Sequence, residues 1–307
     1  MNLKSLTLLL FSASLFIYLS GCDDYSQNSY TEQYVVEAYL TANNDLPPVR
    51  VSTTLPAGQP YTFENAALDS AEVSISRIGE QGNVRAQTTY HQPDTGRSGY
   101  YYPVASENQK VQALSEYRLQ VQPPNGTQTV RARTFVPDTF RVQESANDTI
   151  AYQATEQIET TISSIRTPYQ DQSHFIFTVI SDNPRFENLT PFYKDQADDE
   201  TDISDFIKND SGIINEGNFD INPDGSITLK LPWIGFAFYE KNAVVTSSID
   251  KNLYDFVRSQ SVQTGGSTLA PGEIQNVIYH VENGIGVFGS MSSDTIHTYL
   301  ERPFSNN

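Results

Sequence analysis

The stretch from Asp220 to Leu231, "DINPDGSITLKL", contains the residues whose types and spacing best suit a chemical role. Its oxygen-bearing side chains recur at every second position, as hard oxygen ligands do in a calcium-binding loop, and Gly225 stands where such a loop bends sharply. Two features depart from that loop: Pro223 lies within it, and Leu231 occupies the place of the bidentate glutamate. The predicted calcium ligands are Asp220, Asn222, Asp224, Ser226 and Thr228.

The same stretch also fits a purely structural role, which is the more common use of such a sequence. Asn-Pro-Asp-Gly at 222–225 is typical of a β-turn, and the apolar residues from Ile227 to Leu231 alternate as in a strand. An acid-rich segment at 194–206 could supply further ligands through Asp198, Asp199 or Glu200, or could be a solvated loop. Calcium is the only cofactor that the sequence suggests.

Cys22, the only cysteine in 307 residues, is the second candidate. Lys4 and the apolar run 6–19 precede it, and this run is shorter than the roughly 20 residues that span a bilayer. The pattern is typical of a secretory signal, and Leu-Ser-Gly-Cys at 19–22 resembles a bacterial lipobox. We therefore predict a signal peptide at 1–21, a thioether-linked diacylglycerol on Cys22 and a lipidated tether at 22–33. The alternatives are an uncleaved anchor or a buried structural cysteine.

The sequence beyond the tether predicts a mainly β fold. "EYRLQVQPPNGTQTVRARTFVP" alternates on both sides of a Pro-Pro-Asn-Gly turn, so Asn125-Gly126 should close a hairpin. About seven such runs fall between 34 and 137, which favours an Ig-like or transthyretin-like β-sandwich there. A second β-rich domain, sandwich or barrel-like, is predicted at 138–307.

One amphipathic helix is predicted at about 249–261, in the second domain. Ile249, Leu253, Phe256 and Val257 recur on one helical face. Ser248 is the expected cap, because serine accepts hydrogen bonds from the free amides of a first turn.

The net charge and the lack of known catalytic motifs argue against several classes of function. A formal net charge of −18 argues against nucleic acid and against docking on anionic lipid. The chain contains no Gly-x-Ser-x-Gly elbow, His-Glu-x-x-His or phosphate-binding loop. The four histidines, at 91, 174, 280 and 297, are scattered. We expect a protein that is not an enzyme, with a carboxylate-dependent hydrolase as the least favoured alternative.

Two further patterns in the sequence concern aromatic residues and glycines. Tyr100–Tyr102, with Tyr61 and Phe63 nearby, could form a sugar-binding platform or part of a sandwich core. The glycines at 284, 286 and 289 favour a turn and close strand packing over phosphate binding, because no helix is predicted directly after them.

Several motifs in order resemble the Bacteroidetes lipoprotein family called domain of unknown function 4249. After the lipobox come the segments 34–40, 70–75 and 117–137, then Asn276 and the terminal signature Asn283–Gly289. Ala270-Pro271-Gly272 departs from the Asn-Pro that the family commonly has there. The resemblance implies an outer-membrane or surface location and genes often beside those of TonB-dependent receptors. Asp23-Asp24 resembles the acidic export signal of Bacteroidetes surface lipoproteins, whereas an aspartate there in proteobacteria would indicate inner-membrane retention.

The expected function is therefore a non-catalytic accessory to a TonB-dependent receptor in nutrient capture. A structural or adhesive, glycan-binding surface lipoprotein is the alternative. The expected partners are the membrane through the lipid anchor, a TonB-dependent receptor, and a glycan or other nutrient ligand.

Overall fold

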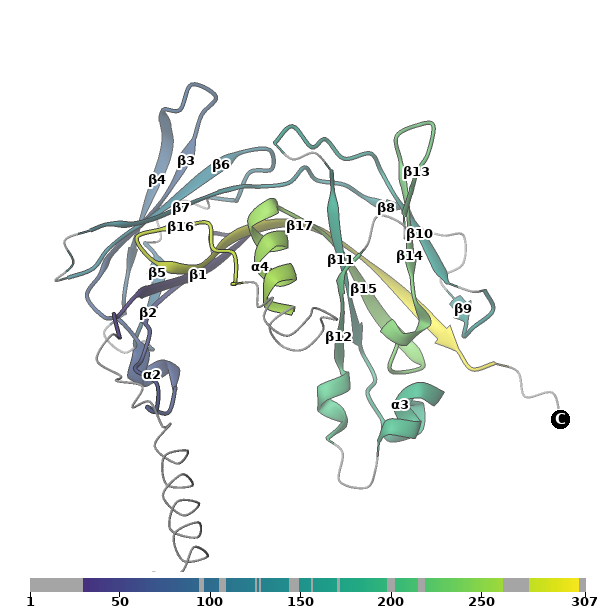
Figure 1. Cartoon of the computed structure of the whole chain (residues 1–307). Helices are drawn as coiled ribbons and strands as arrows, with labels where there is room; N and C mark the ends of the chain where they lie inside the picture. Colours follow the sequence, from purple (N-terminus) through teal and green to yellow (C-terminus); the bar gives the residue numbers. More distant parts are fainter. Residues whose placement is uncertain are drawn as a thin grey trace, which may run out of the picture.

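The structure is a computed structural model that describes residues 30–303 except 94–96, 105–108, 125, 127, 144–148, 156, 170–171, 198–201, 215–218 and 262–275. The predicted signal peptide and Cys22 lie outside these residues. Strands dominate and helices are few and short, so the prediction of a mainly β fold is confirmed (Figure 1). None of the helices in the described residues is long and apolar enough to cross a membrane.

Most strands join one continuous sheet. Its strands are ordered in space as β12 (Lys208–Ile213), β11 (His174–Ser181), β15 (Glu240–Ile249), β17 (Ile285–Glu301), β1 (Tyr34–Thr41), β2 (Val49–Thr53), β5 (Tyr100–Pro103), β4 (Val84–His91), β3 (Glu72–Ile78), β6 (Glu116–Gln122), β7 (Val130–Phe135) and β16 (Val281–Glu282). A further strand, β9 (Thr149–Ala151), pairs with the end of β17. The hairpin predicted between 117 and 137 is formed by β6 and β7.

A second, smaller sheet faces the C-terminal part of the large one. It consists of β13 (Phe219–Ile221), β14 (Ile227–Leu231), β10 (Ile158–Ile162) and β8 (Val142–Gln143). The short helical segments are α2 (Phe63–Ala66), η2 (Phe186–Asn188), α3 (Pro191–Gln196), η3 (Ile203–Phe206), η5 (Trp233–Gly235) and α4 (Lys251–Ser261).

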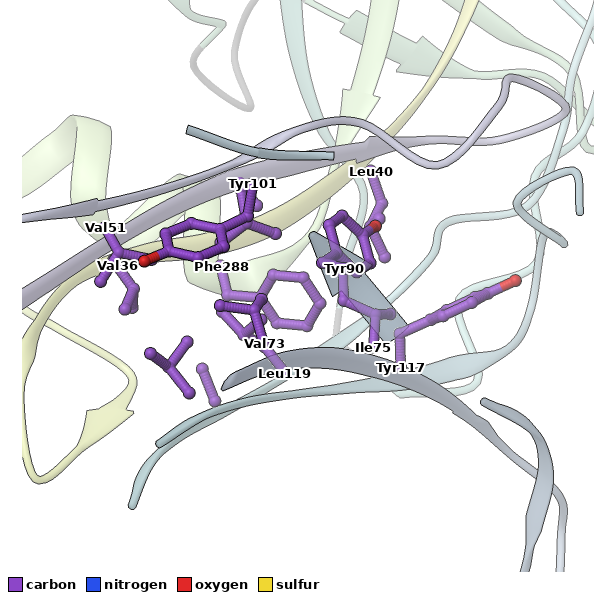
Figure 2. Close-up of a cluster of buried hydrophobic side chains, with 14 of the residues drawn as sticks. Val36, Leu40, Val51, Val73, Ile75, Tyr90, Tyr101, Tyr117, Leu119 and Phe288 are labelled. Carbon is purple, nitrogen blue, oxygen red and sulfur yellow. The ribbon is translucent and has the colours of Figure 1, made fainter. Parts of the chain in front are cut away.

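The first hydrophobic core lies where the large sheet folds over on itself. Alternation along each strand sends every second side chain inward, because successive residues of a strand point to opposite faces. Val36 of β1 and Val51 of β2 thereby meet Val73 of β3 and Leu119 of β6 (Figure 2). Phe288 of β17 is buried in the same core, so a C-terminal strand completes the N-terminal sandwich.

Tyr101 belongs to this core and not to the surface. Its side chain is fully buried, and its hydroxyl donates a hydrogen bond to the carbonyl of Leu68 at 2.7 Å and accepts one from the amide of Ala71 at 2.9 Å. Tyr100 packs edge-to-face on Phe63, and Tyr61 is 64% exposed. The tyrosine-rich stretch is thus divided between the core and the surface.

The second core fills the space between the small sheet and β11, β15 and β17. Phe175 and Phe177 of β11 meet Leu229 of β14 and Ile162 of β10, and all four side chains are fully buried. The two cores share one strand, because β17 pairs with β1 in parallel from Ile285 to Met291 and with β15 in antiparallel from Met291 to Leu300. Figure 1 shows β17 running from one core to the other.

The predicted helix is present as α4, with a corrected start. Ile249 ends strand β15, where it pairs with Met291, and the predicted cap Ser248 lies buried within the same strand. The cap is Asp250, whose carboxylate accepts a hydrogen bond from the amide of Leu253 at 3.0 Å. The helical pattern wrongly includes residues 248–249. Their backbone groups remain in the ladder with β17, so they continue the strand and do not begin the helix.

Candidate functional site

An open cleft of about 880 Å³ lies over the outward face of β6 and β7. The alternation that buries Leu119 and Ala132 in the first core sends Arg118, Arg131 and Arg133 to the opposite face. The other walls are the segment 165–169, the N-terminus of α4, and residues 279–282, which include β16. Segments far apart in the sequence therefore meet at this cleft.

The cleft is locally rich in positive charge although the chain is strongly acidic. Five of the 19 Lys and Arg residues of the chain line it, against three of the 37 Asp and Glu residues. The basic residues are Arg118, Arg131, Arg133, Arg166 and Lys251, and the acidic ones are Glu116, Asp250 and Glu282. Charge complementarity at the cleft therefore favours an anionic ligand.

Three of these cations are already paired. Arg118 forms an ion pair with Glu116 at 2.7 Å, Arg166 with Asp138 at 2.8 Å, and Lys251 with Asp255 at 2.9 Å.

Arg131 and Arg133 differ from those three, because within the described part of the chain neither guanidinium takes part in an ion pair. Arg133 stands directly opposite Arg118 across the β6–β7 ladder. Like charges in that position repel, so a bound anion would be stabilising.

Aromatic rings accompany the arginines in the cleft wall. Phe135 follows Arg133 on the same face of β7, and its ring lies against that of Tyr169 with the centroids 3.5 Å apart. Tyr169 is 63% exposed and Tyr279 is 38% exposed. Both rings thus offer apolar faces to a ligand next to the charged groups.

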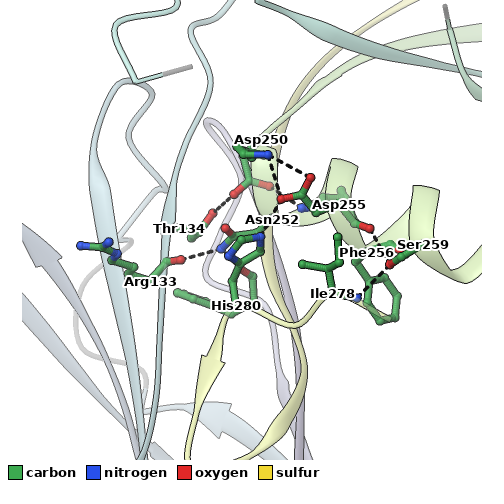
Figure 3. A network of polar contacts seen from close by, with 12 residues as sticks. Arg133, Thr134, Asp250, Asn252, Asp255, Phe256, Ser259, Ile278 and His280 are labelled. Atoms are coloured by element: carbon green, nitrogen blue, oxygen red, sulfur yellow. Dashed lines mark hydrogen bonds and ion pairs between the residues drawn. The ribbon is translucent and has the colours of Figure 1, made fainter. Parts of the chain in front are cut away.

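Asp250 lies at the inner wall of the cleft and ties three elements together (Figure 3). Its carboxylate accepts hydrogen bonds from the hydroxyl of Thr134 on β7 at 2.5 Å and from the amide of Ser290 on β17 at 3.1 Å, besides capping α4. Asn252 adds a bond from its side-chain amide to the carbonyl of Phe288 at 2.9 Å. Burial raises the pKa of Asp250 to about 6, although its hydrogen bonds oppose the shift.

A second acidic side chain, Asp255, holds the segment before β16 to the helix. His280 Nε2 lies 2.7 Å from its carboxylate, and the amide of Ile278 donates to Ser259 Oγ at 3.0 Å (Figure 3). Burial acts to raise the pKa of Asp255, but the hydrogen bonds and charges of Lys251 and His280 outweigh it and hold the pKa below its usual range. These contacts fix the wall that carries Tyr279.

The predicted calcium ligands lie on the β13–β14 hairpin, away from the cleft. Asp224 accepts hydrogen bonds from the amide and the hydroxyl of Ser226 at 2.9 and 2.7 Å. Asn222 donates to the hydroxyls of Ser226 and Thr228, and Asp220 forms an ion pair with Lys230 at 2.8 Å. The hairpin turn of the alternative interpretation is present, and calcium binding at it stays a prediction.

The remaining candidate metal ligands do not form a metal centre among the described residues. Cys22, Asp198, Asp199 and Glu200 lie outside the described residues. Within those residues, no group of three or more His, Cys, Asp or Glu side chains is placed to hold a metal ion. Of the histidines, His174 is buried and stacks on Tyr254 with the ring centroids 3.8 Å apart.

A protein-family model described as "Domain of unknown function (DUF4249)" matches residues 23–297. The chain belongs to the DUF4249 family. No curated protein matches it.

Solved structures resemble this DUF4249 chain only distantly. The three N-terminal domains of the highly immunogenic outer capsid protein (Hoc) of bacteriophage RB49 match at 11% identity, over 89% of this chain and 71% of that chain, with a TM-score of 0.23. Trypsin-activated α2-macroglobulin from Escherichia coli matches at 9% identity, over 72% and 14% of the two chains, with a TM-score of 0.21. The tetra-tandem repeat of a large adhesion protein also has a TM-score of 0.21, at 11% identity over 87% and 49%. TM-scores this low do not establish a relationship in fold or function between these proteins and this chain.

The first and last motifs of this DUF4249 chain lie side by side. The segment 34–40 forms β1, the terminal signature enters β17, and the two strands pair in parallel with Val36 opposite Gly286 and Tyr39 opposite Gly289. A Cβ at Gly289 would stand 3.0 Å from the Cβ of Leu253 on α4. The prediction that these glycines permit close packing is confirmed.

The arginine cleft was not predicted from the sequence. A signal was present, because the hairpin at 117–137 places Arg118, Arg131 and Arg133 at its polar, alternating positions. Arg166 and Tyr169 carry no comparable signal, since their segment reaches the cleft only through the tertiary structure.

Proposed function

We propose that this DUF4249 protein is a lipid-anchored outer-membrane protein that binds a ligand without catalysis, as an accessory to a TonB-dependent receptor in nutrient capture. The observation that carries the binding role is the open cleft, in which Arg131 and Arg133 stand beside exposed aromatic rings. The anchor rests on the lipobox at 19–22, and the receptor rests on the family resemblance.

Affinity purification of the tagged protein from its own outer membrane, followed by mass spectrometry, tests the receptor partnership. We expect one TonB-dependent receptor to co-purify in near-equal amount. Recovery of the protein without a receptor would contradict the proposed accessory role.

The Cys22→Ser variant tests the anchor. Because the thioether forms on the cysteine sulfur, the variant should lose incorporation of labelled fatty acid and leave the outer-membrane fraction. Unchanged labelling and fractionation would contradict the anchor, whatever the receptor experiment shows.

An adhesive, glycan-binding role without transport is the second candidate, and the same cleft favours it. It predicts a ligand but no co-purifying receptor. A glycan-binding screen on the purified protein, read together with the co-purification, separates the two roles.

A further inference from the structure

We propose that the cleft over β6 and β7 binds an acidic polysaccharide, with Arg131 and Arg133 receiving its carboxylate or sulfate groups. The inference rests on the proposed binding role and specifies its ligand class. It needs no receptor, so it can fail or succeed independently of the accessory role.

The placement of the two arginines suits repeated anionic groups. They occupy alternate positions on one face of β7, so their Cα atoms are about 7 Å apart on a rigid strand. Each guanidinium can bind a carboxylate or sulfate through two parallel hydrogen bonds, which a lysine cannot do. Neither guanidinium is held in an ion pair by another described residue.

The neighbouring rings favour a sugar chain over other polyanions. Tyr169 and Tyr279 line the same cleft and are exposed, which gives a ligand apolar surface to contact between its charged groups. A cleft of about 880 Å³ has room for several sugar units but would hold an isolated phosphate loosely.

The rest of the molecule argues against the two competing classes of ligand. A nucleic acid extends well beyond one cleft, and outside it the chain of net charge −18 would repel the phosphates. An acidic peptide that adds a strand needs a long free sheet edge, whereas β16 pairs with Arg131 and Ala132 and so interrupts the edge of β7.

The acidity of the chain does not prevent binding at the cleft. At physiological ionic strength charges are screened over about 8 Å, so the arginines within the cleft dominate the local potential. Distant acids act mainly on the long-range approach of the ligand.

Binding of polygalacturonate and chondroitin sulfate to the purified protein, measured by isothermal titration calorimetry, tests the proposal. Neutral dextran, poly-L-glutamate and an oligo-dT strand are the comparison ligands. We expect binding of at least one acidic glycan and none of dextran. Equal or tighter binding of poly-L-glutamate or oligo-dT would overturn the sugar assignment, and failure of both acidic glycans to bind would overturn the site.

Matched variants locate the site. The double variant Arg131→Gln/Arg133→Gln should weaken binding about tenfold or more, because two charge-assisted contacts are lost. Arg85→Gln/Arg185→Gln removes the same charge from exposed arginines that do not line the cleft, and should leave the affinity nearly unchanged.

Three controls complete the test. An equal loss in both double variants would show non-specific attraction and refute the site. Arg131→Lys/Arg133→Lys keeps the charge but loses the fork geometry, so it should still weaken binding. Thermal melts of all variants check that they fold, which the exposure of both arginines leads us to expect.

Discussion

Gly286 lies directly opposite Val36 in the parallel pair of β1 and β17, and a Cβ at position 286 would stand 2.1 Å from the carbonyl oxygen of Val36. Gly286 also has a φ of +112°, which side chains disfavour. The contact lies where β17 completes the N-terminal sandwich, so the packing of the first core depends on a residue without a side chain.

Gly286→Ala should therefore lower the free energy of unfolding by about 3 kcal/mol or more, through both the clash and the backbone strain. Urea denaturation followed by tryptophan fluorescence measures it. Gly82→Ala is the matched control: φ is +75° there, but a Cβ would meet nothing within 4 Å, so we expect a loss of about 1 kcal/mol. Similar losses at the two positions would contradict the close contact.

Asp250 should make stability fall as the pH rises in the acid range. Burial raises its pKa from 3.8 to about 6, so between these values the folded state holds a proton that the unfolded chain has lost. The free energy of unfolding then decreases across this range by an amount on the order of 3 kcal/mol. Asp255, whose pKa is lowered, acts in the opposite direction, and its stabilisation is lost as the pH falls.

Asp250→Asn isolates the effect of Asp250, because asparagine also caps helices but does not titrate. We expect the stability of the variant relative to the unsubstituted protein to rise as the pH is raised from about 4 to about 6. Urea denaturation at a series of pH values measures it. A stability difference that is constant with pH would show that Asp250 does not titrate in this range.

Tyr101→Phe should destabilise the first core although it keeps the ring. The variant leaves the half-buried carbonyl of Leu68 and the buried amide of Ala71 without their partner, a loss of about 1–3 kcal/mol. Tyr61→Phe, at an exposed position, should change stability by less than about 0.5 kcal/mol. Equal changes in the free energy of unfolding for the two variants, measured by denaturant titration, would contradict a stabilising role for the Tyr101 hydroxyl.

The β13–β14 hairpin should not need calcium to form. Without any metal, Asp224 already accepts two hydrogen bonds from Ser226 and Asp220 already pairs with Lys230, so these contacts can hold the turn by themselves. We expect the same Tm in EDTA and in about 1 mM calcium, the range in which extracellular sites bind. A rise in Tm with calcium that Asp224→Ala abolishes would establish the predicted metal site.

The sequence by itself determined the local elements. Alternation along 117–135 was enough to predict the β6–β7 hairpin, and the helical face of Leu253, Phe256 and Val257 was enough to predict α4. These patterns succeed because the period of a strand or helix and its buried face are properties of a short segment. The start of α4 was wrong because Ile249 pairs with Met291 in β17, a contact that no local pattern reveals.

Only the tertiary structure decided which elements meet. The parallel pairing of β1 with β17 joins the two ends of the chain, and the cleft brings Arg131 and Arg133 of a hairpin to Tyr169 of a separate segment and Tyr279 of another. Such contacts depend on how two sheets bury their apolar faces against each other. That burial is a sum over residues distant in the sequence, so one segment read alone cannot specify it.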